Sequence, residues 1–200
     1  MSTSGEPPAT NPRGIPTAPF VEDVETFAPT RESIAPALQK FQEMIAKYQF
    51  MELNTTRRAT SLREKIPDIT KTLDTVIFLS SRSSSDDLAD DDDEKPSALT
   101  TTFELNDTLY AKATIPTDLK EVYLWLGANV MLSYPIDEAE KLLKDKLRAA
   151  KESLKNCEED LEFLKKQITT LEVNTARLFN HEVTMKRKER EEMEEGKGKS

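Results

Sequence analysis

Residues 122–134 read VYLWLGANVMLSY and continue into PIDEAEKLL at residues 135–143. Apolar residues fill both alternating faces of this stretch, and Gly127, Ala128 and Asn129 interrupt it as turn residues. It is the most hydrophobic part of an otherwise polar chain. Strands that are apolar on both faces are covered on both faces. The stretch therefore predicts a β-hairpin that needs more cover than one small sheet can provide.

A second hairpin precedes it, at residues 102–115. Apolar residues there recur at odd positions, with Asn106 and Asp107 as turn residues. Four strands cannot cover themselves twice, so we expect the hairpins at 101–135 to make contacts between subunits. Trp125 is expected in an apolar core, either of its own sheet or of a joint with a neighbour, with a surface contact as the alternative. The expected assembly residues are Phe103, Leu105, Leu109, Val122, Leu124, Trp125, Leu126, Val130, Met131 and Leu132.

A heptad pattern lies on each side of the hairpins. Apolar residues alternate at spacings of four and three, which is typical of a coiled-coil seam. The first seam predicts a helix over residues 31–80, with a bend or break at Pro67, and the second predicts a helix over 136–188. Since both seams meet the hairpins, the two helices are expected to pair antiparallel. The seam positions are 38, 41, 45, 48, 52, 55, 59, 62, 66, 69, 73 and 76, then 143, 147, 150, 154, 157, 161, 164, 168, 171, 175, 178, 182 and 185.

The expected fold class is therefore α+β, a long antiparallel two-helix coiled coil with two tandem β-hairpins between the helices. The proline-rich residues 1–30 predict a mostly disordered tail, in which FVEDVETF at 20–27 is a candidate docking helix. Residues 81–100 predict an acidic flexible linker and 189–200 a charged tail that frays.

Composition excludes several functional classes. The chain has net charge −9 and no basic stripe, which argues against a nucleic-acid partner. No apolar run approaches the ~20 residues that span a bilayer, so no membrane partner is expected. Cys157 and His181 are the single cysteine and histidine, and they lie about 36 Å apart along the predicted helix, too far for a nucleophile and its base. We expect no enzyme, no metal and no cofactor, with Cys157 in the core and His181 solvated.

The far end of the predicted coiled coil carries more apolar surface than one two-helix seam buries. Large exposed apolar surfaces often mark interaction sites. We therefore expect a client-binding tip there, made of Ile34, Leu38, Phe41, Met44, Ile45, Leu178, Phe179, Val183 and Met185.

Five segments together resemble the α-class prefoldin subunits. They are FVEDVETF, KYQFMELN at 47–54, IPDI at 66–69, YLWLGANVMLSYPIDEA at 123–139 and EEDLEFLKKQITTLEVNTARLFN at 158–180. The resemblance implies a hetero-hexamer of α- and β-class subunits. The expected location is the cytoplasm, because residues 1–14 have neither the basic nor the apolar region of a signal peptide, and a second, nuclear location stays open. The hairpins of this family join in a double β-barrel, and its coiled coils capture unfolded actin and tubulin for the cytosolic chaperonin without ATP. The alternative is a coiled-coil scaffold or tether, although a plain tether needs no tandem hairpins.

Overall fold

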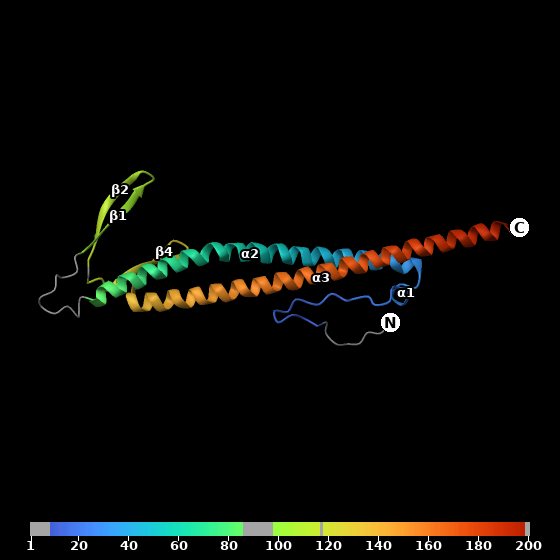
Figure 1. Ribbon diagram of the computed structural model, residues 1–200, viewed down its shortest axis with the longest axis horizontal. Helices are drawn as coiled ribbons and strands as arrows, with labels where there is room; N and C mark the ends of the chain where they lie inside the picture. The colour runs from blue at the N-terminus through green and yellow to red at the C-terminus, as the bar shows by residue number, and fades with distance from the viewer. Residues whose placement is uncertain (1–8, 86–97, 117, 199–200) are drawn as a thin grey trace. The chain divides into compact units, whose positions relative to one another are not determined.

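The structure is a computed structural model that describes residues 9–85, 98–116 and 118–198 (Figure 1). Its elements are the short helix α1 (Val24–Phe27), the long helix α2 (Arg31–Ser85), strands β1 (Leu99–Asn106), β2 (Leu109–Ile115), β3 (Glu121–Gly127) and β4 (Val130–Pro135), and the long helix α3 (Ile136–Gly198). Two long helices with two antiparallel strand pairs between them confirm the predicted α+β class. The chain forms two compact units, Met1–Thr60 with Lys155–Ser200, and Ser61–Leu154.

Both predicted seams are confirmed. Every seam position on α2 and on α3 is buried or half-buried. In the first unit, residues 34–48 of α2 pack against residues 164–178 of α3. In the second unit, residues 73–76 of α2 pack against residues 136–143 of α3. The start of each helix therefore packs against the end of the other, which makes the pair antiparallel.

The ends of the helices differ from the prediction. Helix α2 stays helical across Pro67 and reaches Ser85, and α3 continues past residue 188 to Gly198. Lys, Arg and Glu are good helix formers, and pairs such as Glu182–Lys186 support one another at a spacing of four. Of the predicted linker 81–100, residues 86–97 lie outside the described part of the chain.

The two hairpins lie in the second unit. β1 pairs with β2, and β3 pairs with β4, each in an antiparallel two-stranded sheet. The β3–β4 turn has positive φ at Ala128 (49°) and Asn129 (60°), as a type I′ turn requires, and the preceding Gly127 has φ 98°. This hairpin packs on the helices through Leu124, which joins the buried cluster of Leu73, Val76, Ile136, Ala139 and Leu143.

The N-terminal segment differs most from the prediction. We call residues 9–28 the strap, because they lie along the first unit and enter its core. Ala18, Val21 and Ala28 are buried in one cluster with residues of α2 and α3. The predicted short helix at the end of the strap is present as α1, capped by Asp23. The strap is ordered because partners far away in the sequence supply its hydrogen bonds, which a local composition argument does not see.

Candidate interaction surfaces

Most of the predicted assembly residues are exposed on the hairpins of the single chain. On β1 and β2, Phe103 and Leu109 are 60% and 57% exposed, and on β3 Trp125 is 59% exposed. Trp125 pairs across the sheet with Met131, which is also exposed. Leu105, Leu126, Val130 and Leu132 are exposed as well. Trp125 thus does not belong to this chain's own core.

The β3–β4 hairpin uses its two faces differently. Val122 and Leu124 on β3 and Tyr134 on β4 turn toward the helices and are buried or half-buried. Tyr123 and Trp125, at the alternate positions of β3, remain in solvent. Alternation along the strand explains the division, because neighbouring side chains point to opposite faces. One apolar face is therefore partly covered within the chain, with Leu132 opposite Leu124 still exposed, and the other face is not covered.

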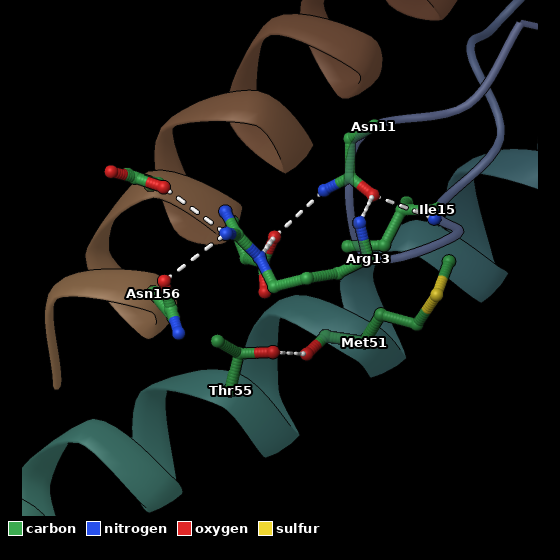
Figure 2. A network of polar contacts seen from close by, with 8 residues as sticks. Asn11, Arg13, Ile15, Met51, Thr55 and Asn156 are labelled. Atoms are coloured by element: carbon green, nitrogen blue, oxygen red, sulfur yellow. Dashed lines mark hydrogen bonds and ion pairs between the residues drawn. The ribbon is translucent and has the colours of Figure 1, made fainter. Parts of the chain in front are cut away.

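The strap is anchored to α3 at a turn near residue 13 (Figure 2). The Asn11 side chain accepts hydrogen bonds from the backbone N–H groups of Arg13 and Ile15, and donates one to Asp160 at 2.7 Å. The Arg13 guanidinium donates to Asp160 at 2.6 Å and pairs with Glu159 at 3.1 Å. The turn is thus held by one ion-paired arginine and one amide.

Three side chains of α3 bind the backbone of the strap further along, and we call Gln167, Asn174 and Arg177 the main-chain clamp. Gln167 Oε1 accepts from the N–H of Ala18 at 2.8 Å. Asn174 accepts from the N–H of Val21 at 3.2 Å and donates to the carbonyl of Pro19 at 2.7 Å. Gln167 and Asn174 are buried, 7% and 0% exposed, so these bonds satisfy amides that would otherwise lack partners.

Arg177 completes the clamp. Its guanidinium donates to the carbonyls of Val21 at 2.6 Å and Glu22 at 2.8 Å, and it lies over the ring of Phe20, 5.6 Å from the centroid. Hydrogen bonds from a charged donor are shorter and stronger than neutral ones. The strap is therefore bound through its backbone as far as the start of α1.

The end of the strap is fixed by α1. The Thr26 hydroxyl and the backbone N–H of Glu25 donate hydrogen bonds to the Asp23 carboxylate. These bonds lower the pKa of the carboxyl group, and the bond from Thr26 has the larger effect. The N-cap of α1 is accordingly a charged carboxylate at neutral pH. Phe27 then stacks on Phe41 of α2, with ring centroids 5.8 Å apart.

The strap changes the predicted client-binding tip. Ile34, Phe41 and Leu178 are at most 3% exposed and share one core with the strap, so these three side chains are not the free surface that the sequence predicted. The strap uses much of the apolar surface that the two-helix seam leaves over. Partly buried against the same core are Leu38, Met44, Ile45 and Met185, while Val183 is half-buried and Phe179 is 57% exposed.

A shallow groove of ≈ 380 Å³ remains between α2 and α3 in this unit. Its apolar lining consists of the side chains of Leu38, Ile45, Ala176 and Phe179, and its polar lining comes from Gln42, Glu172 and Thr175. Three of the predicted tip residues therefore do come together at an open surface.

Sequence reasoning missed the clamp, although a signal was present. Asp160, Gln167 and Asn174 are spaced by seven residues, so they form a polar stripe on one side of α3 next to the seam. Among the described residues, no helix is long and apolar enough to cross a membrane, and no group of three or more His, Cys, Asp or Glu side chains is placed to hold a metal ion.

The chain is similar to a well-defined group of proteins. A family model described as "Prefoldin subunit" matches residues 48–181. A protein of Elsinoe fawcettii named "Prefoldin subunit 3" is 58% identical over 94% of this chain and 88% of its own length. "Probable prefoldin subunit 3" of Schizosaccharomyces pombe is 51% identical over 90% and 97%, and "Prefoldin subunit 3" of Homo sapiens is 42% identical over 88% and 85%.

Proposed function

The chain belongs to the prefoldin family of chaperone subunits, and we propose that it is one subunit of a hetero-hexamer of α- and β-class prefoldin subunits. In this proposal the complex works in the cytoplasm. It binds unfolded clients of the actin and tubulin type at the ends of its coiled coils, and delivers them to the cytosolic chaperonin without ATP.

One observation carries the assembly part of the proposal. Each hairpin exposes large apolar side chains: Phe103 on β1–β2, and Trp125 and Met131 on β3–β4. Large apolar side chains gathered in solvent often mark a protein interface, and an uncovered two-stranded sheet is only marginally stable in water. Neighbouring subunits would provide the missing cover. A coiled-coil tether, the competing function, gives no reason for these exposed faces.

The client part of the proposal rests on the open groove between α2 and α3. Leu38, Ile45 and Phe179 offer an apolar surface that is shallow and too small for strong binding alone. Several such surfaces on one complex raise the effective concentration of each further contact, so a client with many apolar segments is held by avidity. A shallow site without a deep pocket suits clients of differing sequence.

Assembly is tested by co-expressing the chain with α- and β-class prefoldin subunits and recording native mass spectra. We expect a discrete hetero-hexamer with the unchanged chain. The double variant Trp125→Ser, Met131→Ser should lose it, because the two side chains lie side by side on the exposed face of β3–β4. The matched control is Lys112→Ser, an exposed polar position on β2. A homodimer or fibre of the unchanged chain, or an intact hexamer of the double variant, would contradict the proposal.

A further inference from the structure

The clamp residues on α3 have the spacing that suits an extended chain. Gln167 and Asn174 are seven residues apart, which is about 10.5 Å along a helix. Their partners Ala18 and Val21 are three residues apart in the strap, and three extended residues span about 10 Å. Two turns of helix thus match three residues of extended backbone.

The clamp recognises backbone atoms. Its hydrogen bonds go to the N–H groups of Ala18 and Val21 and to the carbonyls of Pro19, Val21 and Glu22. Every polypeptide offers these groups. The side chains that the strap buries here are small, alanine at 18 and valine at 21, so the site requires little of the sequence that occupies it.

The strap is suited to local release. Its two aromatic side chains, Phe20 and Phe27, are 58% and 49% exposed, so its burial in the core comes from Ala18, Val21 and Ala28, with Ile15 and Val24 partly buried. Its polar anchor at Arg13 is exposed to solvent. Segments with few buried apolar contacts open at a lower free energy than the rest of a protein. The strap can therefore leave while the seams of α2 and α3 stay paired.

We propose that the clamp is a binding site for extended segments of unfolded protein, and that the strap is its internal occupant, which a client displaces. This inference rests on the client-binding function proposed above. The client segment takes the hydrogen bonds of the strap one for one and places small apolar residues at the positions of Ala18 and Val21. Displacement also removes Phe27 from the ring of Phe41, on which it stacks with centroids 5.8 Å apart. The strap thus competes with the client for the clamp, so a polypeptide that binds the clamp more weakly than the strap does is not held there.

The test uses the assembled hexamer containing the full-length chain, and reduced, carboxymethylated α-lactalbumin as a permanently unfolded probe. Hydrogen exchange is followed at the amides of Ile15, Thr17, Ala18 and Val21, all of which are hydrogen-bonded in the closed strap. The open-strap variant is Ala18→Asp, Val21→Asp, which buries two charges if the strap closes. Its control is Thr17→Asp, which adds charge at an exposed position of the same segment.

We expect probe binding to speed exchange at these four amides in the unchanged complex. If the strap is closed about nine-tenths of the time, the open-strap variant should bind the probe about tenfold more tightly, with the control unchanged. Two results would overturn the inference and leave the proposed function intact: strap amides that stay protected while probe is bound, or an open-strap variant with intact helices that binds no more tightly. If the helices of the open-strap variant unfold, the inference is judged by amide exchange in the strap of the unchanged complex with and without probe. Failure of all three complexes to bind probe would remove the proposed function and this inference together.

Discussion

At the scale of the residue, Tyr48 links α2 to the strap. Its ring is 3% exposed, and its hydroxyl donates to the carbonyl of Pro16 at 2.9 Å. Burial raises the pKa of the Tyr48 phenol, because the charged form is poorly solvated there. Tyr48 therefore has two functions: it fills a seam position of α2, and its hydroxyl anchors the strap.

Replacing Tyr48 by phenylalanine should loosen the strap without opening the seam. The lost hydrogen bond costs about 1 kcal/mol, seen as faster amide exchange in residues 15–21. The raised pKa adds a pH dependence: the contribution of the phenol is fully present below its unfolded pKa of about 10 and is lost as the pH rises through the higher folded value. Exchange is compared at pH 8 and at increasing pH above 10, corrected for intrinsic rates, and the difference in strap protection between the two proteins should shrink as the pH rises. A strap equally protected in both at pH 8 would contradict this role.

At the scale of the element, stability comes from the seams. Leu171 is completely buried on α3, whereas Val173, two residues further on, is 44% exposed. The contrast follows from helical periodicity, because residues two apart lie on nearly opposite faces of a helix. The two positions provide a matched comparison within one turn.

Leu171→Ala should therefore destabilise the coiled coil by about 2–5 kcal/mol, through lost burial and the cavity that remains. Val173→Ala should change the free energy of unfolding by no more than about 0.5 kcal/mol, as is usual for exposed positions. Urea unfolding of the full-length chain in its complex, followed by circular dichroism, measures both. Similar losses for the two variants would show that the seam does not control stability here.

At the scale of the whole molecule, we propose client capture at a surface on the first unit and assembly through the hairpins of the second. Phe179→Ser should lower the suppression of aggregation of unfolded actin by the hexamer, since Phe179 is exposed and lines the groove. The loss of client affinity in the whole hexamer should exceed the loss at the single altered site, because each bound site raises the effective concentration for the next contact. Phe50→Ser is the control, an exposed phenylalanine on α2 outside the groove lining. Equal suppression by both variants, with hexamers intact, would refute the assignment.

The sequence alone was enough for the seams and both hairpins. Leu164 and Leu171 repeat at heptad spacing, and Asp107 and Asn129 lie in the turns, so each element is encoded by residues close together in the chain. The same local arguments did not foresee that Ile34 at the tip is buried, or that residues 9–28 of the proline-rich tail pack on the helices.

Only the tertiary structure decided how the strap and the tip are arranged. Ala18 meets Gln167 across 149 residues, and Val21 meets Asn174 across 153. No local pattern in residues 1–30 encodes these contacts, because the partners that satisfy the strap's backbone are side chains of a distant helix. Proline-rich composition indicates that a segment cannot build its own core, but it does not indicate whether another element supplies one. For this chain α2 and α3 together supply it, and Ala18, Val21 and Ala28 of the strap are buried in their shared core while Phe179 stays exposed.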